Sequence, residues 1–211
     1  MHLKGINGKI SPAQWMEELF AFHPEYSDID VAVETGTFRG DGPLWFSKFF
    51  EEIHTVEINE GLHNLAKTRC ATCESLDKIT FHLGDSAIVV PVLAEQIKKP
   101  VLWLLDAHFC LWAKAKEWNE PCPVRGNFPL WAELEAISKR PYADIVLVDD
   151  SPVFGVSRDK DRVPGDTSPQ WESVSDEVIT KALGRVIDSV EWQKSQIYWR
   201  TPLSILTKES L

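Results

Sequence analysis

The feature that most constrains this fold is an apolar run that ends in a carboxylate and is followed at once by three glycines. Its sequence is VAVETGTFRGDG, residues 31–42, and an aromatic-rich stretch covers residues 43–52. The apolar run predicts a buried strand, the glycines predict a tight turn, and the aromatic stretch predicts a packed helix. In a strand–turn–helix unit, backbone N–H groups and the helix N-terminus can approach a nucleotide cofactor. The segment therefore predicts an α/β fold with a cofactor site at the turn.

A second carboxylate, Glu57, ends the next apolar run, residues 53–56. A carboxylate about 20 residues beyond the first glycine, at the tip of the next strand, is placed to accept hydrogen bonds from ribose hydroxyls. We therefore expect the turn and the two strand ends to hold an adenosine-bearing cofactor. The residues expected to bind it here are Glu34, Thr35, Gly36, Thr37, Gly40, Gly42 and Glu57.

Apolar runs alternate with helical patterns along most of the chain, which is typical of a parallel sheet with helices on both faces. A tail of one helix and two closely spaced strands predicts an antiparallel hairpin. The expected fold is a Rossmann-like three-layer α/β sandwich with a seven-stranded, mostly parallel sheet. The expected strands are 30–35, 53–58, 78–83, 101–106 and 144–149, with a hairpin of 195–200 and 203–207; the expected helices are 43–52, 60–76, 86–98, 129–139 and 175–190.

Length and charge limit the organisation and the partners. The 211 residues predict one domain, 1–211, and the net charge of -10 argues against nucleic acid as a partner. No signal peptide and no membrane-spanning run is recognisable, so we expect a cytoplasmic protein without a membrane partner. Residues 1–27 read as a helical extension that packs over the cofactor or a partner subunit, which leaves a homo-oligomer possible. The loops 109–128 and 156–170 are expected to be lids.

Further carboxylates follow the later strands, and the carboxyl ends of parallel strands meet at one edge of a sheet. Asp85 and Ser86 are placed to hydrogen-bond an adenine ring. The remaining oxygen ligands at this edge suit a hard divalent cation such as magnesium. They are Asp106, Asp149 and Asp150, with His108 beside them. Of the four cysteines, only Cys70 and Cys73 have zinc-ligand spacing, so reduced thiols are favoured over structural zinc.

The glycine spacing Gly36-x-x-x-Gly40-x-Gly42, with Glu34 two residues before it, resembles motif I of class I S-adenosylmethionine-dependent methyltransferases. A narrower similarity lies in LLDAH (104–108), PLxxELxxI (129–137) and VDD (148–150). These segments resemble the small-molecule O-methyltransferases related to macrocin and novobiocin sugar methyltransferases. The resemblance implies the cofactor S-adenosylmethionine, a magnesium ion, and a catalytic pair at the end of the fourth strand. The ligands would be Asp106, Asp149 and Asp150, and His108 would be the general base.

The expected function is therefore magnesium-assisted methyl transfer from S-adenosylmethionine to a hydroxyl of a small molecule, such as a sugar, a polyol or a catechol-like metabolite. Trp112, Trp118 and Arg125 would belong to the lid. Two alternatives stay open. One is a cofactor-binding module without catalysis, although such a module has no need to concentrate carboxylates. The other is a different metal-dependent enzyme; a non-haem iron site would need a second histidine beside His108.

Overall fold

A computed structural model describes residues 21, 24, 27–108, 128–149, 154–155, 171–192 and 195–200. Its centre is a sheet whose order is β3-β2-β1-β4-β5-β7-β6. Five neighbouring strands are parallel, as in a Rossmann-like α/β fold, so this part of the prediction is confirmed. They are β1 (Val31–Thr35), β2 (Glu52–Glu57), β3 (Ile79–Leu83), β4 (Leu102–Leu105) and β5 (Ile145–Val148).

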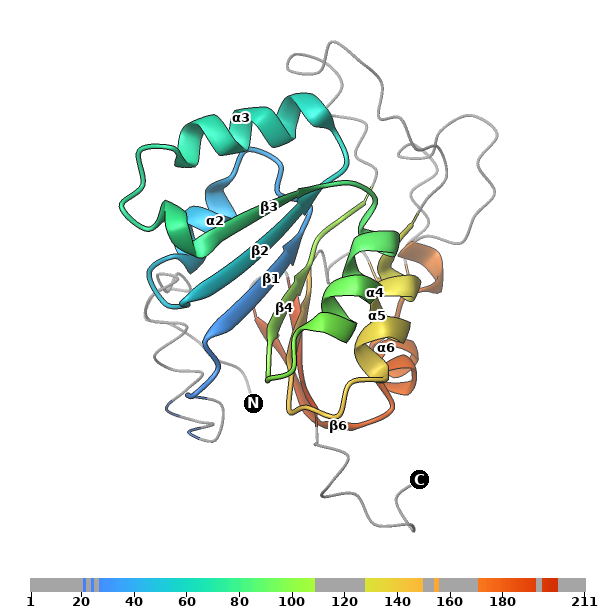
Figure 1. Cartoon of the computed structure of the whole chain (residues 1–211). Helices are drawn as coiled ribbons and strands as arrows, with labels where there is room; N and C mark the ends of the chain where they lie inside the picture. The colour runs from blue at the N-terminus through green and yellow to red at the C-terminus, as the bar shows by residue number, and fades with distance from the viewer. Residues whose placement is uncertain are drawn as a thin grey trace, which may run out of the picture.

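The helices between these strands cover the two faces of the sheet. In Figure 1, α2 (Asp41–Phe46) and α3 (Glu60–Cys70) lie on one side of it. The other side is covered by α4 (Ser86–Gln96), α5 (Leu130–Ser138) and α6 (Asp176–Leu183). Alternation along β1 explains this division, because successive side chains of a strand point to opposite faces. Val31 and Val33 pack in the core beneath α4, α5 and α6, and Ala32 packs in the core on the α2 side.

Helices α2 and α3 both end well before the residue that the sequence predicts. The prediction continues α2 to residue 52, but the helix ends at Phe46, and Glu52 already pairs with Val31 as the first residue of β2. The prediction continues α3 to residue 76, but that helix ends at Cys70, and the short 3-10 helix Leu76–Lys78 leads into β3. Pairing of β2 with β1 therefore overrides helical patterning at Glu52, whereas turns and the 3-10 helix separate α3 from β3.

The hairpin beyond α6 differs from the prediction in its position. The helix predicted over 175–190 ends at Leu183, because Gly184 adopts φ +70° and its N–H donates to the Thr180 carbonyl. Strand β6 (Val186–Trp192) follows at once and pairs antiparallel with β7 (Ser195–Arg200), which also pairs antiparallel with β5. The placement of the helix end was therefore wrong, and the predicted strand 203–207 lies outside the described residues.

A buried ionic network closes the edge of the sheet where β5 begins. Asp144, fully buried, accepts hydrogen bonds from Arg140 Nε (3.0 Å), Arg200 Nη1 (2.9 Å) and the Val101 N–H (3.0 Å). The guanidinium groups also donate to main-chain carbonyls at the ends of α4 and α5, where the helix dipole favours a cation. Those carbonyls belong to Ala94, Ile97 and Lys99, bonded by Arg140; to Ile137 and Ser138, bonded by Arg200; and to Ser138 and Arg140, bonded by Arg185.

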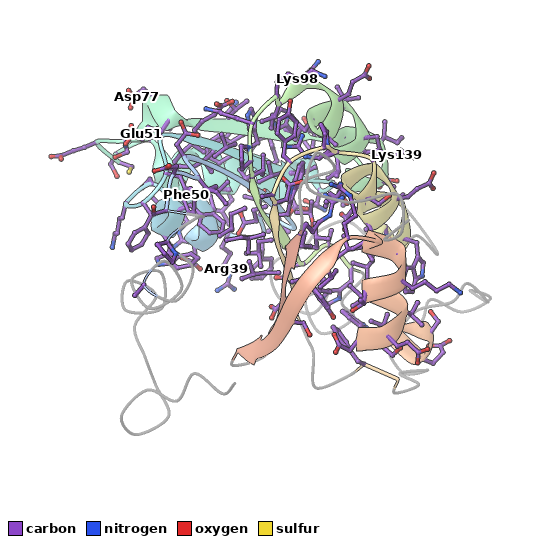
Figure 2. All side chains as sticks on the ribbon, turned by 90° about the horizontal axis from the view of Figure 1, so that it is seen from below. Arg39, Phe50, Glu51, Asp77, Lys98 and Lys139 are labelled. Atoms are coloured by element: carbon purple, nitrogen blue, oxygen red, sulfur yellow. The ribbon has the colours of Figure 1, made fainter. Side chains whose placement is uncertain are left out.

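The charged residues of this network are buried, whereas charged residues next to them in the sequence are exposed. Arg140 is 3% exposed, whereas the adjacent Lys139 projects from the molecule and pairs with Glu135 at 2.7 Å. Figure 2 shows Lys139 and Lys98 at the periphery, and Glu51 and Asp77 at the periphery of the opposite flank. The buried cations are therefore structural, and the exposed ones form a solvated surface.

Several predictions fall on residues that the structure does not describe. These are most of the extension 1–27, the loops 109–127 and 156–170 with Trp112, Trp118 and Arg125, and also Cys110 and Cys122. Cys70 and Cys73 are free thiols. Among the described helices, none combines the length and apolarity that a membrane span requires.

Candidate functional site

The glycine turn after β1 is built for close backbone approach. Gly36 has φ +84°, and a Cβ added there would lie 2.7 Å from the Asp106 carbonyl oxygen. A Cβ on Gly42 would lie 1.6 Å from Glu34 Oε1. Both positions therefore exclude a side chain: the first because the turn abuts the end of β4, and the second because α2 begins against a carboxylate. Phe38, also in the turn, has φ +49°, an uncommon conformation for a residue with a side chain.

Glu34 lies under this turn. Its carboxylate is 5% exposed and accepts a hydrogen bond from Thr55 Oγ1 at 2.7 Å, and Thr55 Oγ1 in turn contacts Thr37 Oγ1 at 2.6 Å. Burial raises the pKa of Glu34 to about 8, because desolvation disfavours the charged form. Glu34 is thus a buried acid held by hydroxyl groups.

Glu57 joins the same turn from the end of β2. Its two carboxylate oxygens accept the Phe38 N–H at 2.8 Å and the Asn59 N–H at 2.9 Å. Burial raises the pKa of Glu57, and the two amides oppose that shift. The structure therefore brings Glu57 to the glycine turn, as the sequence predicts. It also shows a second task for Glu57, which is to fix the backbone of the turn; the ribose contact stays a prediction.

Asp85 and Ser86 stand where β3 passes into α4. Asp85 is the N-cap of α4, and its Oδ1 accepts the Ala87 N–H at 2.9 Å. Ser86 is 5% exposed, and its hydroxyl lies near the carboxylate of Glu133 in α5 and lowers the pKa of that group. This local role explains why an aspartate precedes the helix. Contact with an adenine ring stays a prediction.

The predicted metal and base residues follow β4 and β5, which are neighbours in the sheet. The Asp106 N–H donates to the Thr35 carbonyl at 3.2 Å, and His108 Nε2 lies 3.6 Å from Asp106 Oδ1. The Asp149 N–H donates to the Leu105 carbonyl at 3.1 Å. Asp150 lies outside the described residues. Within the described ranges no cluster of three metal-binding side chains is found, so the magnesium prediction is not confirmed.

An aromatic cluster encloses His108 on one side, and the sequence reasoning did not foresee it. The Trp171 ring lies 5.3 Å from the His108 ring at 73°, and it also contacts Phe128 and Phe154, at 5.1 and 6.0 Å. Trp171 is 6% exposed. The residues come from segments far apart in the sequence, so only the tertiary structure reveals the cluster. It gives His108 a largely apolar wall.

Glu133 is the other site residue that the sequence reasoning missed. Its position carries a signal, because Leu130, Leu134 and Ile137 recur at helical spacing and place Glu133 on the same buried stripe. It is 1% exposed, and burial raises its pKa to about 7. A carboxylate on an apolar stripe is costly and therefore informative.

No family model matches the chain, and no curated protein matches it in sequence. Solved structures with a similar fold include the O-methyltransferase TomG from Streptomyces achromogenes, in complex with S-adenosylmethionine. It is 16% identical, with a TM-score of 0.55, and the match covers 92% of this chain and 82% of TomG. An O-methyltransferase from Bacillus cereus in complex with S-adenosylhomocysteine is 15% identical, with a TM-score of 0.55, and the match covers 92% of this chain and 83% of that protein.

The chain has the fold of S-adenosylmethionine-dependent O-methyltransferases. At these identities the similarity concerns the fold, and the chemistry must be argued from the residues.

Proposed function

We propose that this protein is an S-adenosylmethionine-dependent O-methyltransferase that acts on a hydroxyl group of a small molecule. The observation that carries the proposal is the glycine turn after β1. This turn contacts Glu34, Glu57 and the end of β4 at one edge of the sheet. The fold is shared with two O-methyltransferases, one in complex with S-adenosylmethionine and one with S-adenosylhomocysteine. Open α/β sheets bind their ligands at this edge.

The proposed reaction needs a base near the acceptor hydroxyl. As the methyl group moves to the hydroxyl oxygen, the electron pair of the broken C–S bond stays on sulfur and the hydroxyl proton leaves. His108 is suited to take this proton, because its ordinary pKa is near neutrality and Asp106, at 3.6 Å, can orient the ring and stabilise its charged form. Trp171 shields one side of the ring from water.

Asp106, Asp149 and Asp150 would hold a magnesium ion in this proposal. Asp106 and Asp149 follow neighbouring strands, and carboxylate oxygens are the ligands that magnesium prefers. The ion would act as a Lewis acid that lowers the pKa of the acceptor hydroxyl. A sugar, a polyol or a catechol-like diol fits such a site, and the net charge of -10 favours a small molecule over nucleic acid.

The first experiment is calorimetric titration of the whole chain with S-adenosylhomocysteine, once with magnesium and once with EDTA. We expect micromolar binding and a separate heat for magnesium. Absence of binding in both conditions would refute the proposal. Binding without methylation of any sugar, polyol or catechol offered would favour the alternative, a cofactor-binding module.

A second experiment tests the base. We expect His108→Ala to lower kcat by about 10²- to 10⁴-fold, the usual contribution of a general base, and to leave cofactor affinity unchanged. The matched control is His54→Ala, because His54 contacts Glu52 and His82 on β2 and β3 and has no place in the proposed reaction. Full activity of His108→Ala would remove His108 as the base.

A further inference from the structure

Glu133 is a buried carboxylate that the reaction proposed above does not use. It lies in the first turn of α5, on the helix face that packs against the sheet, and is 1% exposed. Its next acidic neighbour on the helix, Glu135, is exposed and pairs with Lys139. A solvated carboxylate on this helix therefore has an ordinary surface role, and the buried one requires another explanation.

The contacts of Glu133 connect segments that are far apart in the sequence. The hydroxyls of Thr35, the last residue of β1, and Ser86, the first residue of α4, lie close enough to its carboxylate to lower its pKa. The Thr35 side chain and carbonyl in turn accept the Asp106 N–H, at 3.3 and 3.2 Å. One carboxylate thus lies where the ends of β1 and β4 meet the start of α4. These segments carry the glycine turn, the predicted metal ligand and the predicted adenine contact.

One of the two oxygens of Glu133 indicates a further role. Glu133 Oε1 is fully buried and has no hydrogen-bond partner among the described residues. An unpaired buried oxygen costs free energy, so a merely structural anchor would be expected to satisfy both oxygens or to be replaced by a neutral group. The charged groups closest to it, Asp85 and Asp106, are also acidic. Glu133 therefore lies beside two further acidic side chains near the turn.

We propose that Glu133 is a positioning residue that holds the cofactor-binding segments together through Thr35 and Ser86, and that its buried negative charge makes the site favour the cationic sulfonium cofactor over its neutral thioether product. This inference rests on the proposed function. Methyl transfer removes the positive charge from sulfur, so an anion near the turn stabilises the bound reactant and not the bound product. In a medium of intermediate polarity such an interaction is strong enough to change affinity by about tenfold.

The test compares the affinities of S-adenosylmethionine and S-adenosylhomocysteine for the full chain by calorimetry at pH 8, above the pKa of about 7 that Glu133 has in the structure. Glu133→Gln keeps the shape of the side chain and removes the charge. We expect it to weaken S-adenosylmethionine binding about tenfold more than S-adenosylhomocysteine binding. The matched control is Glu135→Gln on the exposed face of the same helix, which should change neither affinity.

A second variant distinguishes the effect of the Glu133 charge from the effect of its contacts with neighbouring segments. Ser86→Ala removes one hydroxyl contact and keeps the charge, so it should weaken both ligands by a similar factor. Circular dichroism and thermal unfolding confirm that each variant is folded. An unchanged affinity ratio in folded Glu133→Gln would overturn the inference while the proposed function stands. If the wild-type protein binds neither ligand, both proposals fail together.

Discussion

Buried carboxylates lie at both ends of the parallel strands, which are two opposite edges of the sheet. They differ in the groups that surround them. At the edge where β5 begins, Asp144 is neutralised by Arg140 and Arg200. At the other edge, Glu34 and Glu133 are also buried, but the side chains that lower their pKa values carry hydroxyl groups. A buried charge requires a counter-charge, or it shifts its pKa. The first edge supplies that counter-charge from the chain itself. In our proposal the cationic cofactor supplies it at the second edge.

The largest effect is expected at the neutralised edge. Asp144→Asn leaves two buried guanidinium groups without their counter-charge and should lower the free energy of unfolding by about 3–5 kcal/mol. Glu34→Gln at the opposite edge should cost far less at pH 7, because the protonated acid is already favoured there. Urea unfolding of both variants measures the difference. Equal losses would contradict the contrast between the two edges.

The next largest effects are expected for alanine substitutions at two glycines, one in the turn after β1 and one at the end of α6. Gly36→Ala combines positive-φ strain of roughly 1–2 kcal/mol with a clash against the Asp106 carbonyl. Gly184→Ala has similar strain at φ +70°, but no atom lies within 4 Å of the added carbon. Chemical denaturation should therefore show the greater loss for Gly36→Ala. Only Gly36→Ala should also lose S-adenosylhomocysteine binding, and retention of full affinity would argue against a cofactor at this turn.

The pH dependence of stability tests the edge that holds Glu34. The folded-state pKa of Glu34 is about 8, against an ordinary value of 4.5. Between these values the folded protein holds a proton that the unfolded chain releases, so the Glu34 contribution to stability falls as the pH rises. The slope is at most about 1.4 kcal/mol per pH unit. Unfolding of wild type and Glu34→Gln should be measured from pH 5 to 8. Parallel curves would show that Glu34 is ionised in the folded protein, contrary to this expectation.

Two helix caps give the smallest effect. Asp85→Ala and Ser175→Ala each remove an N-cap hydrogen bond, to Ala87 and Val178, and each should cost about 1 kcal/mol. Thermal unfolding should show similar losses. Cofactor titration should separate the caps, because only Asp85 stands among the predicted cofactor contacts. Unaltered cofactor affinity in Asp85→Ala would remove Asp85 from that set.

The parallel sheet and the positions of the acidic strand ends could be predicted because they depend on local signals. Apolar runs such as Ile145–Val148 and the glycines after Thr35 determine strands and turns within a few residues. The end of α6 has a local signal as well, because Gly184 interrupts the helical pattern over 175–190. The ionic network around Asp144 could not, because Arg200 meets it only when β7 lies beside β5.

The same distinction applies to the site. Glu34, Glu57 and Asp106 were predicted because each ends a recognisable strand, and the structure brings them to one turn. Trp171 approaches His108 from a segment with no regular pattern, so no local signal indicated it. Glu133 did have a signal, an acidic residue within an apolar helical repeat, and such a break in periodicity is worth following in other sequences.

The insertion of β7 between β5 and β6 has a consequence for the order of folding. Strands β6 and β7 are neighbours in the sequence and can pair early, because closing a short loop costs little entropy. Joining Ile145 to Trp199 requires a much longer closure, and the same step buries Arg200 against Asp144. We therefore expect the hairpin to form before it docks on β5. Mutations at Arg200 should then slow refolding, which stopped-flow measurements would show.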